Sequence, residues 1–324
     1  MVQQLFLLHQ ENSNRTNRKN DDMKRIIYFA ALAALLAGCS KNTQSETPLR
    51  DTPISVNVLM PEILTRAGYD ESNLPTKFYL SIDQNGTKYD YTNVVMKKPE
   101  YGKWEAYESD AENALKKLLL WEGSDLGIFI TAATFPLDGS APYTVSVSDD
   151  QSTDEKLTAS DHLWYSDGVS PDVNGISIPF CHIMSKVKIE INLRDEYAGV
   201  DDPVTSVAVL NTKTQAHYDP KNGTLFGNQS IPASILACKT GYNRGTRIAS
   251  FEVILVPQTV AAGSFGLSIL VGDNTYEWFS GEAVTLGSNK EYTLSLTAGK
   301  DKVSGNTFTT SSWGSGNGIN SATE

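Results

Sequence analysis

The chain has 324 residues and a formal net charge of −11, because 38 acidic residues outnumber 27 basic ones. This length is enough for two domains of ordinary size, and the acidic balance argues against nucleic acid or an anionic membrane surface as partner. Three cysteines and four histidines, none at the spacing of metal ligands, give no basis for a zinc site.

The first segment with a clear pattern is an export signal. Met23-Lys24-Arg25 is basic, residues 26–36 are apolar, and Leu36-Ala37-Gly38-Cys39 follows. The apolar run is too short to span a bilayer permanently, so it predicts a secretory signal peptide over residues 23–38. Because it ends at a cysteine, it resembles a bacterial lipoprotein signal, in which lipid is attached to Cys39. An ordinary secretory signal with an accidental cysteine is the alternative.

The segments on either side of this signal are polar. Residues 1–22 do not look like part of a signal, so we interpret them as an over-extended start with Met23 as the true initiator. Residues 39–50 hold few large apolar side chains and predict a flexible tether between the lipid and the fold.

From residue 51 onward the dominant hydrophobic period is two, which predicts β-strands. Asn85-Gly86 is a hairpin-turn signal, and only residues 111–121 have a pattern compatible with a short helix. We place a domain boundary in the polar stretch that follows Leu193. The strands expected in the first half are Ile54–Met60, Phe78–Ile82, Lys88–Tyr91, Leu126–Ile130 and Cys181–Leu193.

Residues 181–193 give the cleanest strand pattern. Apolar side chains occupy one face, and His182 and Lys186 lie on the other, which we expect to face water. Cys181 falls on the apolar face, so a buried free thiol is expected there. A disulfide between Cys181 and Cys238 is the alternative.

The second half repeats the strand pattern up to Trp313, and a glycine-rich, flexible tail covers 314–324. Many short strands and almost no helical period predict an all-β protein with two antiparallel β-sandwich domains, at 51–194 and 195–313. The strands expected in the second half are Val204–Leu210, Phe251–Val256, Phe265–Val271, Tyr276–Phe279, Tyr292–Ala298 and Thr307–Trp313.

The sequence offers little catalytic chemistry. Ser160-Asp161-His162 holds the residue types of a triad, but neighbours on a strand point to opposite faces, so the three cannot act together. No phosphate-binding loop, nucleophile elbow or two-histidine zinc motif is present, so we expect no enzyme and no cofactor. Trp104 and Trp278 are candidates for stacking on sugars, although half-buried core aromatics are the ordinary explanation.

Several stretches together resemble the fimbrillin family, the lipoprotein-derived type V pilins and their accessory subunits. The order and spacing of these stretches, rather than any one of them, carry the resemblance. They are the LAGC lipobox, the strand ending in Leu64-Thr65-Arg66-Ala67, residues 128–136, 160–165 and 178–187, and the closing strand 307–313.

The resemblance implies two tandem transthyretin-like β-sandwich domains and assembly by strand complementation, in which a neighbouring subunit replaces a removed strand. In such pilins an arginine-specific protease removes the N-terminal strand. Arg66 is the expected cleavage site here, and an uncut surface arginine is the alternative. Arg50 is a second candidate, but Asp51-Thr52-Pro53 beside it makes a poor substrate.

We therefore expect a non-enzymatic pilus subunit that is lipid-anchored at the outer membrane and exposed at the surface, with other pilin subunits as partners. The alternative function is a monomeric surface lipoprotein that binds a host glycan or protein. Stalk, tip and anchor roles stay open.

Overall fold

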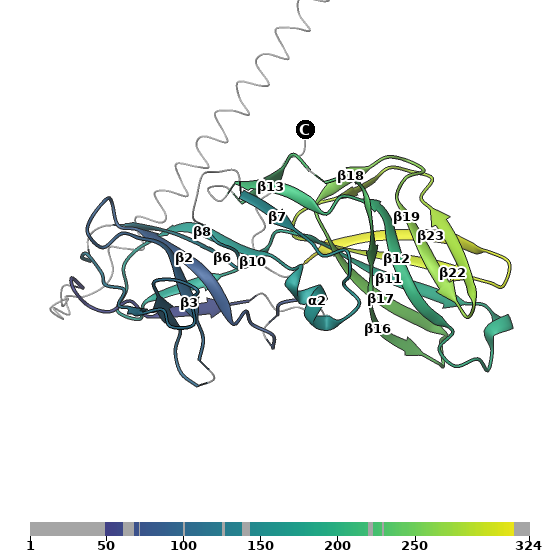
Figure 1. The fold of residues 1–324 in the computed structure, drawn as a ribbon, viewed down its shortest axis with the longest axis horizontal. Coiled ribbons are helices and arrows are strands. Elements are labelled where there is room, and N and C mark those ends of the chain that lie inside the picture. The colour runs from purple at the N-terminus through teal and green to yellow at the C-terminus, as the bar shows by residue number, and fades with distance from the viewer. Residues whose placement is uncertain are drawn as a thin grey trace, which may run out of the picture. The chain divides into compact units, whose positions relative to one another are not determined.

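The computed structural model describes residues 49–60, 68–70, 72–99, 101–124, 127–137, 143–219, 223–228 and 230–313, and the regular secondary structure of these residues is almost entirely β-strand (Figure 1). The all-β prediction is confirmed. Within these residues no helix is long and apolar enough to cross a membrane.

A seven-stranded antiparallel sheet forms the larger layer of the first half. Asn85 and Gly86 have positive φ, of 64° and 74°, but they lie within a longer connection, residues 84–90, and do not form the tight hairpin turn that was expected. The strand after it begins at Tyr91 rather than at Lys88. In spatial order the sheet contains β10 (Cys181–His182), β8 (Leu163–Val169), β6 (Ile128–Ala133), β2 (Lys77–Asp83), β3 (Tyr91–Lys97), β4 (Glu105–Tyr107) and β5 (Lys116–Lys117).

Two further strands share a hydrophobic core with this sheet. They are β1 (Val56–Leu59) and β9 (Ile176–Pro179), which pair in parallel. The alternation predicted for β1 sends Val56 inward, and Val56 and Ile178 belong to the same buried cluster as Phe78, Leu80 and Ile130. These two strands therefore cover one side of the first core.

The second core lies among four sheets and includes the inward-facing residues of β11, β12, β19 and β22. Within these four sheets, neighbouring strands run antiparallel to each other, except that β11 and β22 run parallel. The five-stranded sheet contains β16 (Cys238–Asn243), β17 (Ile248–Leu255), β11 (Ser185–Leu193), β22 (Lys290–Ala298) and β23 (Val303–Ser312). The four-stranded sheet contains β15 (Ala233–Leu236), β12 (Val204–Thr212), β19 (Gly266–Val271) and β20 (Asn274–Phe279). The two small sheets are β14 (Thr224–Phe226), β13 (Gln215–Asp219) and β7 (Tyr143–Ser146), and β18 (Gln258–Val260) with β21 (Val284–Leu286).

The structure corrects the long strand predicted over residues 181–193. The chain breaks between β10, in the seven-stranded sheet, and β11, in the five-stranded sheet. His182 and Lys186 are buried rather than facing water, because Asp161 and Glu252 supply partners for them. Both described cysteines, Cys181 and Cys238, are free, but Cys181 is half-buried rather than buried as expected.

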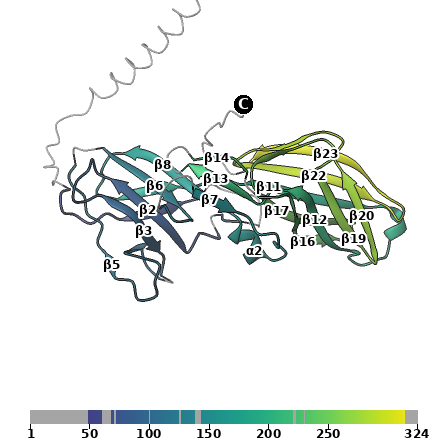
Figure 2. The same ribbon diagram turned by 45° about the horizontal axis from the view of Figure 1, so that its top comes forward.

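The expected domain boundary after Leu193 does not separate one group of sheets from the other. β11 pairs with β17 and β22 of the second half, and β7 pairs with β13, so two strands from before residue 194 belong to the later sheets (Figures 1 and 2). The division into two sandwich domains stays a prediction, because the residues from Pro48 onward group as one compact unit.

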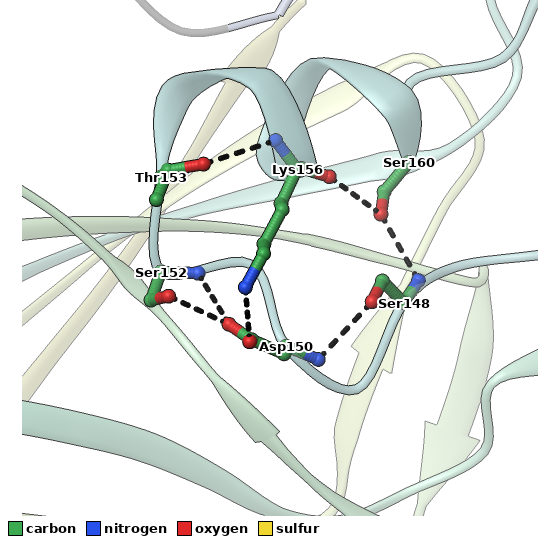
Figure 3. A network of polar contacts seen from close by, with 6 residues as sticks. All are labelled: Ser148, Asp150, Ser152, Thr153, Lys156 and Ser160. Carbon is green, nitrogen blue, oxygen red and sulfur yellow. Dashed lines mark hydrogen bonds and ion pairs between the residues drawn. The ribbon is translucent and has the colours of Figure 1, made fainter.

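The helix also lies elsewhere than predicted. Residues 111–121 contain the short strand β5, whereas the helix α2 covers Asp154–Ala159. Thr153 caps α2 by accepting a hydrogen bond from the Lys156 backbone N–H, and the Lys156 side chain pairs with Asp150 (Figure 3). At the other end the Ser160 hydroxyl donates to the Lys156 carbonyl and accepts from the Ser148 N–H. A 3₁₀ turn, η1, covers Asp195–Tyr197.

Candidate functional site

Residues 49–60, which we call the leader segment, lie between two other pieces of chain. On one side, Asp51 N–H and Ile54 N–H donate to the carbonyls of Trp121 and Leu119, at 2.9 and 2.8 Å. On the other side, Ile176 N–H donates to Ser55 O at 2.8 Å and Phe180 N–H to Leu59 O at 3.1 Å. The leader segment therefore completes the backbone hydrogen bonding of both neighbours, as an inserted strand does.

The side chains of the leader segment alternate between the core and solvent. Ile54, Val56 and Met60 are 8%, 5% and 8% exposed, and Val58 is packed against the same buried cluster. Leu59, on the opposite face, is 52% exposed. The inward side chains belong to the first core, and we call the positions that they fill the groove. The same buried cluster includes Leu119, Trp121, Ile176, Ile178 and Phe180.

Gly175 lies against the leader segment more closely than any side chain would permit. A Cβ atom at Gly175 would lie 2.0 Å from the Ser55 carbonyl oxygen, and its φ of +88° is in the region that favours glycine. The Asn174-Gly175 pair reads as a turn in the sequence, but the sequence gives no sign of this contact.

The start of the leader segment is held by charged groups. Arg50 forms an ion pair with Glu122 at 3.3 Å, and the Tyr89 hydroxyl contacts the Asp51 carboxylate. The Asp51 N–H is also bonded to the Trp121 carbonyl, so the backbone directly after Arg50 is held in place.

The chain returns to the described structure at Gly68 and is fastened there by Asp161. One carboxylate oxygen of Asp161 accepts the Tyr69 N–H at 2.9 Å, and the other accepts the His182 Nδ1–H at 2.9 Å. His182 stacks on Trp313, with ring centroids 4.0 Å apart and an angle of 7° between the planes. Burial raises the pKa of Tyr69, and the negative charge of Asp161 raises it further.

The neighbours of Asp161 take other partners. The Ser160 hydroxyl bonds to Ser148 and Lys156 near α2, and the His162 Nε2–H donates to the Ser146 carbonyl at 2.8 Å. Burial lowers the pKa of His162. The residues Ser160-Asp161-His162 therefore form no proton relay, and the buried Asp161–His182 pair acts as a clasp between distant segments.

The aromatic residues considered for sugar stacking are part of the cores. Trp104 packs edge-on against Phe78, with centroids 4.7 Å apart, and Trp278 packs against the second core. By contrast, Phe129 is 47% exposed. It borders a surface hollow of about 430 Å³ that Asp83 also lines. In the described part of the chain no three potential ligands gather closely enough to hold a metal ion.

Two predicted site residues, Cys39 and Arg66, lie outside the described residues. The contacts of Asp161, His182 and Gly175 have no signal in the sequence, because their partners are distant along the chain.

Comparisons with known proteins concern both the fold and the signal. A model of the fimbrillin-like family matches residues 131–313, and a model of prokaryotic membrane lipoprotein lipid attachment sites matches residues 23–40. No curated protein sequence matches the chain.

The structure is also similar to crystal structures of two proteins described as proposed cell adhesion proteins. The one from Bacteroides ovatus is 15% identical, with a TM-score of 0.57 over 81% of this chain and 96% of that one. The one from Bacteroides uniformis is 16% identical, with a TM-score of 0.51 over 81% of this chain and 99% of that one. At these identities the likeness concerns the fold alone.

Proposed function

Because the chain belongs to the fimbrillin-like family, we propose that it is a non-enzymatic subunit of a surface pilus. It is exported as a lipoprotein through the signal peptide at residues 23–38, which the match to the lipid attachment site at 23–40 supports, and it is anchored by lipid at Cys39 in the outer membrane. It joins other pilin subunits by strand complementation and serves adhesion at the cell surface.

The observation that carries this proposal is the leader segment and its groove. Removing the segment would leave the Ile176 and Phe180 N–H groups and the Leu119 carbonyl without partners. Each such group costs roughly 1–3 kcal/mol when buried and unpaired. It would also expose the apolar groove, and each refilled apolar position is worth about 1.5–3 kcal/mol. A replacement strand is therefore strongly favoured.

A single cut after Arg66 would have two consequences, because of where Arg66 lies in the chain. Arg66 lies after the leader segment and before Gly68, where Asp161 fastens the rest of the chain. Cleavage after Arg66 would detach both Cys39 and the leader segment while leaving Tyr69 bound. An uncut chain would keep its lipid and its own strand, as an anchoring subunit would.

The test uses purified chain with Cys39→Ser and an arginine-specific protease. We expect one early cut, a new N-terminus at Ala67, and exchange of the released segment for a labelled peptide of residues 49–60. Arg66→Gln is the control and should resist the early cut. Early cleavage at another site, or a cut chain that never takes up the peptide, would contradict the proposal.

A second candidate function, binding of a host glycan, is favoured by the hollow beside Phe129. Phe129 on β6 pairs with Asp83 of β2 on one side and with Gly168 of β8 on the other. A sugar ring could therefore approach the exposed ring of Phe129 beside the Asp83 carboxylate. Glycan-array binding that Phe129→Ala abolishes and Phe279→Ala preserves would support it. Phe279 is the matched control because it is also exposed, at 40%. Equal binding by both variants would contradict it.

A further inference from the structure

Asn85 lies in one of two turns that share a sequence pattern. Residues 83–86 and 172–175 both read Asp-x-Asn-Gly. In each, the aspartate Oδ1 accepts the backbone N–H of the asparagine, at 2.8 Å for Asn85 and 2.7 Å for Asn174, and both asparagines are exposed. We propose that Asn85, and not Asn174, is a site of spontaneous deamidation in the folded chain. The reaction converts an amide of the hollow beside Phe129 into a carboxylate.

The reaction joins the Asn85 side chain to the main chain of the next residue. The Gly86 backbone nitrogen gives its proton to hydroxide and attacks Cγ of Asn85, so a new C–N bond closes a five-membered imide. The bond between Cγ and Nδ2 breaks, and the nitrogen takes a proton from water and leaves as ammonia. Water then opens the imide to aspartate, by breaking the bond from Cγ to the Gly86 nitrogen, or to isoaspartate, by breaking the main-chain bond. The net change is one water taken up and one ammonia lost, without oxidation or reduction.

The two turns differ at the glycine nitrogen, which is the nucleophile. The Gly86 N–H donates no hydrogen bond to any described residue, so nothing in that part of the chain holds its proton. A Cβ added at Gly86 would meet nothing within 4 Å, so the residue has room to rotate toward the Asn85 side chain. Since glycine also has no side chain to block the attack, the nitrogen of this turn is accessible.

Gly175 is held on two sides. Its N–H donates to the Asp172 carbonyl at 3.0 Å. On the other side, a Cβ at Gly175 would lie only 2.0 Å from the Ser55 carbonyl oxygen, so the residue is packed against the leader segment. Attack on the Asn174 side chain therefore has to wait until this turn opens, and a local opening slows a reaction in proportion to how rarely it occurs.

Deamidation of Asn85 would change one wall of the hollow. The Asn85 Nδ2–H donates to the Gly127 carbonyl at 3.0 Å, which ties the connection between β2 and β3 to the residue before β6. This bond is exposed and has to open before the reaction. A carboxylate cannot donate in its place, and it adds a negative charge to a lining in which Asp83 is the charged residue. The product is a looser and more acidic hollow, whether or not the chain is a pilus subunit.

The test follows both asparagines in one chain. Purified chain with Cys39→Ser is kept at mildly alkaline pH in heavy-oxygen water, and its peptides are mapped by mass spectrometry over time. The heavy oxygen marks molecules that reacted during the incubation. In the folded chain Asn85 should convert at least about tenfold faster than Asn174, because Asn174 waits for local opening. In denaturant the two should convert at similar rates, because they share the same local sequence pattern.

Three results would overturn the proposal. Equal rates in the folded chain would show that the glycine contacts do not matter, and faster conversion at Asn174 would reverse the assignment. An Asn85 that converts in denaturant but stays intact in the folded chain would show that the fold protects both turns.

Gly86→Ala tests the nucleophile, with Gly123→Ala as its control. An added Cβ meets nothing within 4 Å at either position. Gly86→Ala should slow conversion of Asn85, because the methyl group hinders attack by the nitrogen that carries it, whereas Gly123→Ala should leave the rate unchanged. A product without isoaspartate, formed at the same rate in both variants, would exclude the imide route.

Asn85→Asp tests the consequence, with Asn174→Asp as its control. Both changes introduce the same charge in the same sequence pattern, but the Asn174 side chain donates no hydrogen bond to the described residues. Backbone amides of residues 84–90 should exchange faster with solvent in Asn85→Asp than in Asn174→Asp. Equal exchange would show that the Asn85 amide does not hold this wall of the hollow.

Discussion

Asp161 joins three parts of the chain that are far apart in sequence. Its backbone N–H donates to Thr158 O at the end of α2, which fixes its position, and its carboxylate accepts from Tyr69 and His182. His182 in turn stacks on Trp313, the last described residue. The clasp therefore secures the beginning of the chain that would remain after a cut at Arg66.

Replacing Asp161 with alanine should lower the free energy of unfolding by roughly 1–3 kcal/mol, because the His182 Nδ1–H and the Tyr69 N–H would both lose their acceptor. Denaturant unfolding followed by tryptophan emission measures this, since Trp313 lies against His182. Asp201→Ala, at an exposed position, is the control. Identical unfolding midpoints for the two variants would show that the clasp does not stabilise the fold.

His162 should make part of the stability depend on pH. Burial lowers its pKa below the ordinary value of 6.5, so the unfolded chain binds a proton more readily than the folded chain does. The stabilisation is complete above about pH 6.5 and falls as the pH drops toward the folded-state pKa. His162→Gln should remove this component. Unfolding free energies at pH 7.5 and 5.5 measure it, and an equal pH-dependent loss in both proteins would contradict the expectation.

At the scale of the element, the leader segment shows how alternation determines docking. Val56 is 5% exposed and Asn57 is exposed, although they are neighbours. Val56→Asp should place a carboxylate in the groove and lower stability by about 2–4 kcal/mol, whereas Asn57→Asp should have little effect.

Hydrogen exchange gives a local readout of this prediction. The amides of Ile176 and Phe180 donate to the leader segment, so both should exchange faster in Val56→Asp than in Asn57→Asp. If the two variants protect these amides equally, the leader segment does not dock through Val56.

The alternation of apolar and polar residues correctly predicted strands whose inward face is apolar. It failed where a partner distant in sequence determines whether a residue is buried or which conformation it adopts. It predicted β1 and β2, because local residues determine them. It placed Lys186 in water, since a lysine pattern cannot show that Glu252 lies 2.9 Å away. Residues 111–121 were compatible with a short helix, but the pairing of residues 119–121 with the leader segment holds that part of the stretch extended.

The candidate site was predictable only in part for the same reason. The leader segment is visible in the sequence as an alternating strand before Arg66. Its two neighbours, at 119–121 and 175–180, are set by the fold and leave no local signal. The Asp161–His182 pair leaves no local signal either, because 21 residues separate its members.

At the scale of the whole molecule, the order of features along the chain links anchoring to folding. The lipid site, the leader segment, Arg66 and the clasped body follow one another, so whatever happens at Arg66 affects both the membrane anchor and the groove. Complete folding at the membrane would then come before assembly, because the leader segment fills the groove until it is cut away.

This order predicts how the chain partitions between membrane and soluble fractions. With Cys39 intact and no protease, the chain should be found in the membrane fraction, and Cys39→Ser should move it to the soluble fraction. With an arginine-specific protease present, the unaltered chain should also leave the membrane, whereas Arg66→Gln should stay there. Immunoblots of both fractions, with N-terminal sequencing of the released form, measure the effect. A Cys39→Ser chain that stays with the membrane would show that another feature anchors it. Release of Arg66→Gln by the protease would show that the anchor is lost by a cut elsewhere.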